Sequence, residues 1–411
     1  MPTLHQVAWL LPIVSPPVRD GWVLVHRGRI AASGGAGDPV PAPGRRGGET
    51  LSEIEEVRYD EPLAILPGLV NAHTHLELSW MRGQSGPAGS MPAWAARVIA
   101  ARRAAGQDPV EPIADAVQEL RATGTTVVGD VTNTLAAYDA LADSHLSALV
   151  FFELLGFNPP NPQTLVAEAQ VRLSALTPFA WIRSAIVPHA PYSVSPELLG
   201  AIGAASDGAP LSVHLGESMQ EIEFLRSGSG PWRTLLQELG AWADAWAVPG
   251  CGPVEYLDRL GLVTDRLIAV HGVHLTGPEL ERLAAAGATV VTCPRSNRWV
   301  GAGTPPVDRF YASGVRVAMG TDSLASVADL NLFAEMAVVR ALAPGVPAAR
   351  ILRSATLDGA VALGFGAEHG SIEPGKRADL IAVRVPRAVE DVEEYLLSGL
   401  TADVVRWIEA D

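Results

Sequence analysis

The chain has 411 residues, of which 48% are hydrophobic and 18% charged, so it can bury a large core and is too apolar for an intrinsically disordered protein. Its formal charge of −15 comes from 30 basic and 45 acidic residues, and no basic segment is dense enough to bind a nucleic acid backbone. The two cysteines are too few for a disulfide framework, and no uninterrupted apolar run reaches membrane length. We therefore expect a cytoplasmic protein without nucleic acid or membrane partners.

Residues 1–66 consist of short apolar runs separated by glycine and proline. This alternation lacks a helical period and is typical of β-hairpins. The run from Val7 to Val14 is interrupted by Pro12 and has no Lys or Arg before it, which predicts a strand rather than a signal peptide. Residues 34–50, with glycine, proline and paired arginine, are expected to form a loop. The segment 1–66 is assigned to a small β domain.

From about residue 65, short β-branched runs alternate with longer Ala-, Leu- and Arg-rich stretches of helical spacing. This pattern indicates repeated βα units and a parallel sheet. Eight strands are expected, which is the number that a closed barrel needs, so a (β/α)8 TIM barrel is predicted over residues 67–365. The segment 83–92 is expected to form a loop over its mouth. The expected strands are 64–70, 125–131, 148–154, 181–187, 211–214, 267–271, 289–293 and 316–320.

The chain returns to turn-and-strand texture after Gly370, following a helix that is expected to end near Gly364. We assign residues 366–411 to the same small domain as residues 1–66. The predicted fold class is therefore α/β, a TIM barrel with a small β-sandwich domain formed by the N- and C-terminal segments. The barrel is an insertion between the two halves of that domain.

Histidines and one aspartate lie at the ends of the expected strands. His73 and His75 follow the first strand, and side chains two residues apart on extended backbone point the same way. His214 ends the fifth strand, His271 ends the sixth, and Asp322 lies just past the eighth. In a TIM barrel the carboxyl ends of the strands converge at the rim where catalytic residues gather. Three imidazoles and a carboxylate at that rim predict a site for one divalent metal ion, zinc or alternatively iron, with a position open to water.

Six motifs run in order along nearly the whole chain: PGLVNAHTH at 67–75, HLGE at 214–217, HGVHL at 271–275, CPRSN at 293–297, GTDS at 320–323 and GKRADL at 375–380. With these motifs the sequence resembles the amidohydrolase superfamily. The resemblance is greatest to the branch that holds adenosine, S-adenosylhomocysteine and guanine deaminases and triazine chlorohydrolases. Within it, NAHTHLELS at 71–79 and HAPY at 189–192 look similar to aminodeoxyfutalosine deaminases of menaquinone biosynthesis. The resemblance implies that His73, His75, His214 and Asp322 hold the metal.

Other members of the superfamily use two metal ions bridged by a carboxylated lysine at the end of the fourth strand. The only lysine of this chain is Lys376, far from the barrel strands, and the fourth expected strand ends in Val187, Pro188 and His189. A site with a single metal ion is therefore expected.

Each remaining polar group of the site has an expected role. Asp322 can accept the proton of a metal-activated water as the water attacks the carbon that bears the leaving amine. The resemblance implies that Glu217 donates a proton to the ring nitrogen, although a carboxylate there could instead only complement a helix N-terminus. His271 is expected to orient the attacking water rather than to bind the metal tightly.

Five further residues are candidates for contact with the substrate. Trp94 could stack on a purine ring, although tryptophan is also common in protein cores. Arg82 or Arg295 could pair with the carboxylate of aminodeoxyfutalosine, which adenosine lacks. His189 either contacts the substrate or caps its turn, and Glu77 either binds a substrate hydroxyl or braces the histidine loop.

The leading hypothesis is an enzyme with a small-molecule substrate, a metal-dependent hydrolytic deaminase of an adenine-type nucleoside such as 6-aminodeoxyfutalosine. The alternatives are an S-adenosylhomocysteine, adenosine or guanine deaminase, and a hydrolase of another ring substituent. A metal-binding scaffold barrel is the non-enzymatic alternative, but a scaffold has no need of Glu217 and His271 beside an open metal position. The sequence leaves a homo-oligomer possible.

Overall fold

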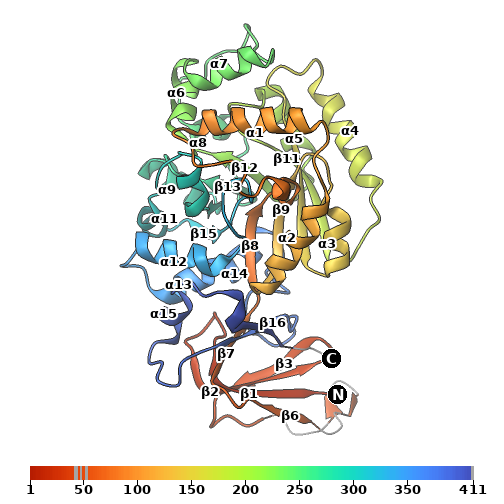
Figure 1. Cartoon of the computed structure of the whole chain (residues 1–411), viewed down its shortest axis with the longest axis vertical. Helices are drawn as coiled ribbons and strands as arrows, with labels where there is room; N and C mark the ends of the chain where they lie inside the picture. The colour runs from red at the N-terminus through yellow and green to blue at the C-terminus, as the bar shows by residue number, and fades with distance from the viewer. Residues whose placement is uncertain (41–44, 47–48, 51–53, 409–411) are drawn as a thin grey trace. The chain divides into compact units, whose positions relative to one another are not determined.

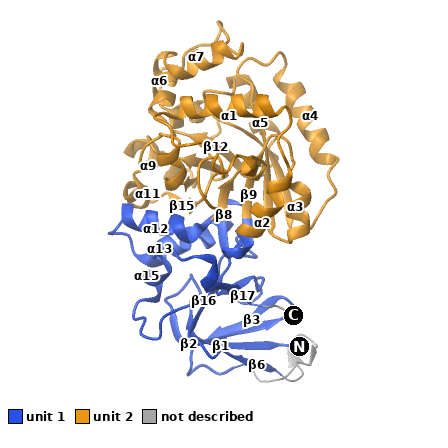
Figure 2. Ribbon diagram, in the orientation of Figure 1, with its two compact units in different colours: residues 1–70, 120–127, 331–411 blue, residues 71–119, 128–330 orange. Residues whose placement is uncertain are grey.

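The computed structural model has a mixed α/β fold and divides into two compact units (Figures 1 and 2). The described residues are 1–40, 45–46, 49–50 and 54–408, so part of the expected loop 34–50 lies outside them. Unit 1 comprises residues 1–70, 120–127 and 331–411. Unit 2 comprises residues 71–119 and 128–330.

A seven-stranded sheet in unit 1 joins strands from both ends of the chain (Figure 2). Its strands are β1 (Thr3–Leu10), β2 (Val18–His26), β3 (Arg29–Gly34), β6 (Glu55–Arg58), β7 (Leu63–Pro67), β16 (Leu380–Arg384) and β17 (Val405–Trp407). Their order is β17-β16-β7-β1-β2-β3, with β6 beside β1. β16 runs antiparallel to β7, and Leu380 lies opposite Pro67. A separate pair consists of β4 (Arg45–Arg46) and β5 (Glu49–Thr50). The β-sandwich and the boundaries at 66 and 366 stay predictions.

The single strand expected at 64–70 is divided at Gly68, so this expectation is corrected. β7 ends at Pro67 and β8 (Leu69–Thr74) begins one residue after Gly68. The Gly68 N–H donates to the carbonyl of Asp379, and a Cβ added at Gly68 would lie 2.7 Å from the Cβ of Thr126. Glycine therefore allows the chain to leave one sheet and enter another.

Two four-stranded sheets carry the strand ends where the site was expected (Figure 1). One has the order β11-β10-β9-β8, with β9 (Thr125–Thr132), β10 (Ser147–Leu154) and β11 (Ile182–Pro188). The other has the order β12-β13-β14-β15, with β12 (Leu211–Leu215), β13 (Leu267–His271), β14 (Thr289–Thr292) and β15 (Arg316–Met319), and its pairs are parallel. These strands are almost entirely buried, as expected for parallel strands covered on both faces.

Helices follow most of these strands, and several begin at a polar cap. The side chains of Asn161, Ser195 and Ser218 each accept the N–H three residues later, which satisfies a donor at the helix start. The helices are η1 (Leu76–Met81), α1 (Met91–Ala105), α2 (Glu111–Ala122), α3 (Tyr138–Ser144), α4 (Pro162–Ser174), α5 (Pro196–Ala205), α6 (Met219–Ser227), α7 (Pro231–Glu238), α8 (Pro253–Arg259), α9 (Gly277–Ala285), α10 (Pro294–Trp299), α11 (Val307–Ser313), α12 (Leu332–Leu342), α13 (Ala348–Ser354), α14 (Leu357–Ala362), α15 (Val392–Leu396) and η2 (Ala402–Val404).

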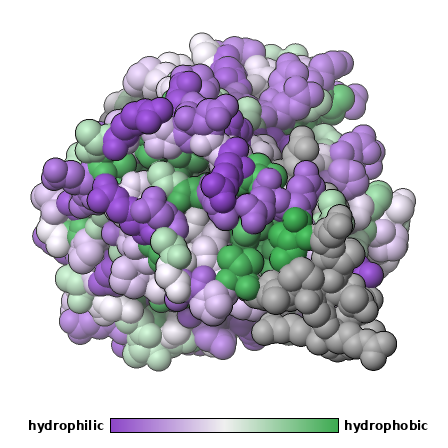
Figure 3. All heavy atoms as spheres, turned by 90° about the horizontal axis from the view of Figure 1, so that it is seen from below, coloured by the Kyte–Doolittle hydropathy of each residue, from purple (hydrophilic) through white to green (hydrophobic). Residues whose placement is uncertain are grey.

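Polar side chains predominate on the face shown in Figure 3, with smaller groups of apolar side chains among them. Scattered apolar surface of this kind is ordinary for a folded protein. Within the described part of the chain, no helix combines the length and the apolar character needed to cross a bilayer. Cys251 and Cys293 are both buried, and no disulfide joins them.

Candidate metal centre and active site

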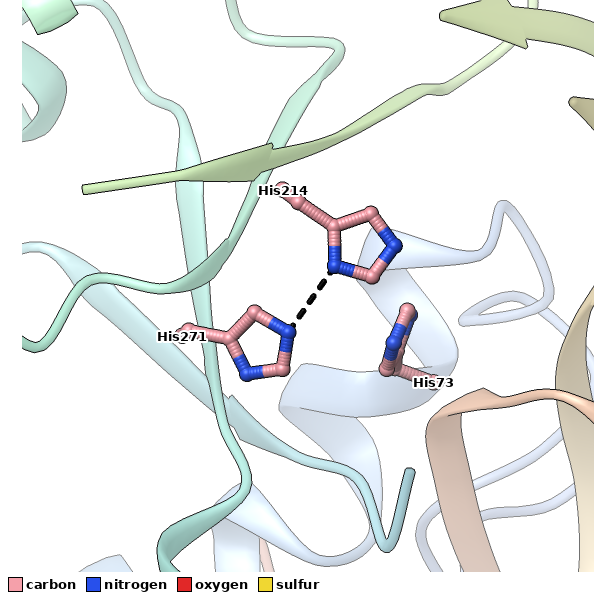
Figure 4. A group of neighbouring side chains, drawn as sticks. All are labelled: His73, His214 and His271. Carbon is pink, nitrogen blue, oxygen red and sulfur yellow. Dashed lines mark hydrogen bonds between the residues drawn. The ribbon is translucent and has the colours of Figure 1, made fainter. Parts of the chain in front are cut away.

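Four histidines and Asp322 converge at the carboxyl ends of the strands of unit 2. His73 lies in β8, His75 follows it, His214 lies in β12, and His271 ends β13. The ring centroid of His73 lies 4.9 Å from that of His75 and 4.9 Å from that of His214. Figure 4 shows the rings of His73, His214 and His271 directed toward one another. The structure thus brings together the residues that the sequence singled out.

The ring nitrogens and the carboxylate oxygens lie close enough together to surround a single ion. Nε2 of His73 and Nε2 of His75 lie 3.9 Å and 3.7 Å from Oδ1 of Asp322. Nδ1 of His214 lies 2.9 Å from Nε2 of His271 (Figure 4). Potential ligand atoms lie within 4.8 Å of one another both in the group of His73, His75 and Asp322 and in the group of His73, His214 and His271. The two groups share His73, and a third group, Glu153, His189 and His214, shares His214 with the second of them, so the three groups adjoin one another at one centre.

This donor set fits a divalent metal ion. His73 is fully buried, and neither of its ring nitrogens has a hydrogen-bond partner. Burial and the neighbouring imidazole of His75 hold the pKa of His73 well below its usual value, so this ring is neutral as a metal ligand must be. A buried nitrogen without a partner is costly unless an ion occupies its lone pair. Imidazole and carboxylate ligands together suit Zn²⁺ and other first-row divalent ions.

The carboxylate of Asp322 is held by neighbouring donors. Ser296 donates its hydroxyl to Oδ2 at 2.5 Å, and the Ser323 N–H donates to Oδ1 at 2.7 Å. The backbone of Asp322 has a φ of 64°, which non-glycine residues rarely adopt. Its N–H donates to the carbonyl of His73, and its carbonyl accepts the hydroxyl of Thr74. These bonds maintain a strained backbone that directs the side chain toward the histidines.

The backbone of His271 is also strained, and neighbouring side chains orient its ring. Its φ is 77°, and its Nδ1 lies 3.0 Å from Nδ2 of Asn297. Its Nε2 faces His214 and lies 3.5 Å from Oε1 of Glu217. Ser296 and Asn297 belong to the motif at 293–297, but the sequence assigned neither of them a role. Their positions beside Asp322 and His271 explain why a polar pair stands in that motif.

Glu217 has the environment of a proton donor. Its exposed fraction is 2%, and its Oε2 has no hydrogen-bond partner. Burial raises its pKa to about 8, a tendency that the nearby carboxylate of Asp322 reinforces and His214 opposes. The carboxyl group is therefore mostly protonated at neutral pH and can act as a general acid.

A cavity of about 390 Å³ leads to this centre, and its inner end is polar while its outer wall is apolar. His75, His214, Glu217, His271 and Asp322 line the inner end. The outer wall comes mainly from α1 and α7 and from the loops after β10 and β11. Its residues include Trp94, Val98, Leu155, Phe157, Tyr192, Trp232, Leu235 and Leu239.

The structure places Glu77 and His189 on the cavity wall and gives each of them a second contact. Oε2 of Glu77 accepts the hydroxyls of Thr132 and Thr134, each at 2.6 Å. The other oxygen, Oε1, accepts a hydrogen bond from NH2 of Arg102 at 3.3 Å. Nδ1 of His189 lies 2.6 Å from the hydroxyl of Ser193, and burial lowers the pKa of His189 to about 4. Each residue thus has a local bracing contact, and contact of either one with a substrate stays a prediction.

Arg82 and Arg295, the expected partners of a substrate carboxylate, do not line the cavity. Arg82 forms an ion pair with Glu119, and Arg295 forms one with Asp329 at 2.8 Å. The arginine on the cavity wall is Arg102 of α1. No local pattern in the sequence indicates Arg102 as a cavity residue, because the Ala- and Arg-rich composition of this helix resembles an ordinary solvated face.

Glu153 is a second residue that the sequence analysis missed. It is the second-last residue of β10 and lines the cavity, and its Oε1 lies 3.5 Å from Nε2 of His214. Burial favours its neutral form, but the imidazoles of His189 and His214 outweigh burial and hold its pKa below the usual range. It faces the edge of the His214 ring opposite to His271, as expected of a carboxylate that orients a ligating histidine. A signal existed, because Glu153 is the only charged residue of the expected strand 148–154.

Comparison with known sequences gives a consistent set of similarities. The model of the amidohydrolase family matches residues 64–404. Aminodeoxyfutalosine deaminase of Deinococcus radiodurans is 36% identical over 335 residues, which cover 76% of this chain and 79% of the relative. A 5-methylthioadenosine/S-adenosylhomocysteine deaminase of Moorella thermoacetica is 31% identical over 416 residues, which cover 96% and 90% of the two chains.

Solved structures show the same fold. An adenosine deaminase from Xanthomonas campestris with bound zinc has a TM-score of 0.80 and 29% identity, with 98% of this chain and 90% of that chain covered. Helicobacter pylori aminofutalosine deaminase in complex with methylthio-coformycin has a TM-score of 0.82 and 23% identity, with 99% of this chain and 97% of that chain covered. At that identity the second similarity concerns the fold alone.

Proposed function

Because this chain belongs to the amidohydrolase family, as its motifs predicted, and is therefore a hydrolytic enzyme, we propose that it deaminates an adenine nucleoside with an extended 5′ substituent. We propose 6-aminodeoxyfutalosine as the preferred substrate, which would place the enzyme in menaquinone biosynthesis. The observation that carries the proposal is the buried carboxyl of Glu217, protonated at neutral pH and 3.5 Å from His271 at the candidate metal centre. The similarity to curated deaminases of adenine nucleosides supports it.

His73, His75, His214 and Asp322 would hold the metal ion, for which we propose zinc. When bound, such an ion lowers the pKa of a water molecule toward neutrality and so supplies the nucleophile. Asp322 accepts the proton of that water through the carboxylate that Ser296 and Ser323 orient.

The other side chains act on the ring and on the leaving group. Glu217 donates its proton to the ring nitrogen that gains charge as the adjacent carbon is attacked. His271, held by Asn297, hydrogen-bonds the attacking water and sets its direction. After proton transfer the amine leaves as ammonia, and the ring retains an oxygen in its place. Each of these steps needs side chains that converge at the inner end of the cavity.

We also infer that the two four-stranded sheets close into one (β/α)8 barrel. Two hydrogen bonds between the neighbouring sheet edges support this inference. The His214 N–H of β12 donates to the carbonyl of His189 just after β11, and the Asp322 N–H just after β15 donates to the carbonyl of His73 in β8. The fold shared with the solved deaminase structures is consistent with closure.

One divalent ion per chain is the expected metal content. Two of the three candidate groups share His73, and the third shares His214 with one of them. The only lysine, Lys376, donates to the carbonyl of Gly366 and the hydroxyl of Ser371, so it cannot bridge two ions at this site. Elemental analysis of the purified protein, calibrated against amino-acid analysis, measures the ratio. Two tightly bound ions per chain would contradict the prediction.

The rate of deamination is expected to fall as the pH rises through about 8. The general acid must be protonated to donate, and Glu217, with its pKa raised to about 8, loses that proton across this range. Above the pKa, kcat should fall about tenfold per pH unit. Initial rates of ammonia release between pH 6 and 10 measure the profile, with metal content checked at each end. A flat profile up to pH 10 would exclude Glu217 as the acid.

The outer part of the cavity favours a nucleoside with a bulky 5′ substituent. Trp94, Val98 and Leu235 offer apolar surface that a free 5′ hydroxyl would leave unused, whereas an aryl or thioether group would bury it. Arg102 adds one cation to this wall, and its NH2 is paired with Asp108 at 2.7 Å and with Glu77 at 3.3 Å. Its NH1 donates to Oδ1 of Asn133 at 3.3 Å, and a carboxylate on the substituent would pair with Arg102 through this nitrogen, beside the two acidic partners of NH2.

Aminodeoxyfutalosine is accordingly expected to exceed adenosine and 5′-methylthioadenosine in kcat/KM. Losing a charge-assisted hydrogen bond costs about 1.5–3 kcal/mol, so the Arg102→Gln variant should reduce the preference for the carboxylated substrate about tenfold to a hundredfold. The ratio of kcat/KM values for the two substrates isolates this effect from changes that affect both.

Arg103→Gln is the matched control, because Arg103 is the exposed neighbour of Arg102 on the same helix. It should leave the ratio unchanged. If 5′-methylthioadenosine or S-adenosylhomocysteine matched aminodeoxyfutalosine in kcat/KM with the wild-type enzyme, the proposed preference for aminodeoxyfutalosine would be wrong. The similarity to the Moorella thermoacetica deaminase would then indicate the better candidate substrate.

A further inference from the structure

The loop between His214 and Glu217 is held by a second buried glutamate, Glu221 of α6. Its exposed fraction is 0%. One carboxylate oxygen accepts the N–H of Gly216 at 2.9 Å, and the other accepts the N–H of Glu217 at 3.0 Å. Both oxygens of one side chain thus bind two consecutive peptide groups next to the expected proton donor.

The carbonyl side of this loop is held by the segment after β13. The carbonyl of Leu215 accepts the Gly272 N–H at 3.1 Å, and the carbonyl of Gly216 accepts the His274 N–H at 2.8 Å. Gly216 has a φ of +62°, and a Cβ there would lie 2.5 Å from Cδ2 of Leu275. The backbone from His214 to Glu217 is therefore restrained on both sides. The segment after β13 holds its carbonyl groups, and Glu221 holds its N–H groups.

We propose that Glu221 is a positioning residue for deamination, whose carboxylate fixes the Gly216–Glu217 peptide groups and thereby aims the Glu217 carboxyl at the ring nitrogen of the substrate. The inference rests on the proposed function of Glu217. It assigns Glu221 no contact with the substrate, since Glu221 does not line the cavity. Nothing in the capping of α6 requires it, because the N-cap hydroxyl of Ser218 already accepts the Glu221 N–H at 3.2 Å.

The chemistry of the contact requires a carboxylate of this length. Two adjacent N–H groups need two acceptor atoms, and a glutamine side chain offers only one acceptor and would direct its own N–H2 group at the second donor. An aspartate keeps both acceptors but is one methylene shorter. Burial raises the pKa of Glu221 to about 7, so its carboxyl group is mostly ionised in the alkaline range. There its negative charge disfavours ionisation of Glu217, whereas His214 favours it. The two variants therefore separate the geometry of the contact from its charge.

The test compares Glu221→Gln and Glu221→Asp with the wild type, using aminodeoxyfutalosine and 5′-methylthioadenosine. We expect both variants to retain one metal ion per chain and to lower kcat about tenfold to a hundredfold with KM changed less than threefold, because a small misplacement of an acid slows the chemical step. The alkaline limb of the kcat profile should shift to lower pH in Glu221→Gln and stay in place in Glu221→Asp. Glu223→Gln, an exposed glutamate of the same helix, is the matched control and should resemble the wild type.

Thermal unfolding and metal content distinguish this role from a purely structural one. Folded, metal-loaded Glu221 variants with kcat within twofold of the wild type and unchanged alkaline limbs would overturn the proposal. The proposal would also be overturned if the variants lost activity only in proportion to their loss of metal-loaded chains, with a normal kcat per metal-loaded chain. Because kcat is expressed per metal-loaded chain, this measurement remains possible if one variant folds poorly. If the wild type released no ammonia from any adenine nucleoside, the proposed function itself would fail, and that outcome is recognised before any variant is made.

Discussion

Replacing His73 with alanine is expected to remove the metal ion and to lower deamination by at least about a thousandfold. His73 belongs to two of the three candidate ligand groups, including the one with His75 and Asp322, so its loss leaves both of these groups incomplete. Activation of water by a bound metal contributes several kcal/mol to a hydrolytic reaction, and each 1.4 kcal/mol is a factor of ten in rate. Metal analysis and ammonia release on the same preparation measure both effects.

A histidine outside the centre provides the control for this variant. His145 is exposed, and its ring lies at a tilt beside Trp181, so His145→Ala should keep its metal and its activity. His73→Ala protein that is folded and retains both a stoichiometric metal ion and wild-type turnover would show that the centre lies elsewhere. Circular dichroism establishes that the variant is folded before its metal content is interpreted.

Replacing Glu217 with glutamine is expected to lower kcat by about a hundredfold or more while leaving the metal ion bound. The amide has nearly the shape of the protonated carboxyl group but cannot give up a proton to the ring nitrogen. Because Glu217 lies 3.5 Å from His271 and outside the expected ligand set, its replacement should not reduce metal content. Steady-state kinetics with metal analysis distinguishes loss of the acid from loss of the centre.

The pH profile of this variant provides a second readout. The decline above pH 8 expected for the wild type should disappear in Glu217→Gln, since the group responsible is no longer present. A metal-loaded, folded variant with near wild-type turnover would assign the acid role to another residue, and Glu153 would then be the next carboxyl group on the cavity wall to test.

The inner part of the site could be predicted from the sequence, because the types of its residues and their spacing along the chain already indicate a metal centre. His73 and His75 lie two apart at a strand end, and the strands that carry His214 and His271 are short apolar runs bounded by turns. Buried strands of this kind are specified locally by β-branched residues and hydrophobicity, so their positions could be read from the sequence.

The outer part of the site could not be predicted in the same way. Whether Arg82, Arg102 or Arg295 reaches the cavity depends on how α1 and the loops pack, and that packing is decided by contacts between residues far apart in the sequence. Arg82 is taken up by Glu119 and Arg295 by Asp329, pairings that no local pattern indicates. The division of the first expected strand at Gly68 was missed for the same reason, because the crowding by Thr126 that requires a glycine comes from another strand.

Release of ammonia from a panel of adenine nucleosides, with metal content determined on the same sample, tests the central claim most directly. The panel should contain aminodeoxyfutalosine, 5′-methylthioadenosine, S-adenosylhomocysteine and adenosine. We predict one divalent ion per chain and deamination of the nucleosides with extended 5′ substituents, with the highest kcat/KM for aminodeoxyfutalosine. A folded, metal-loaded enzyme that releases no ammonia from any member of the panel would contradict the account.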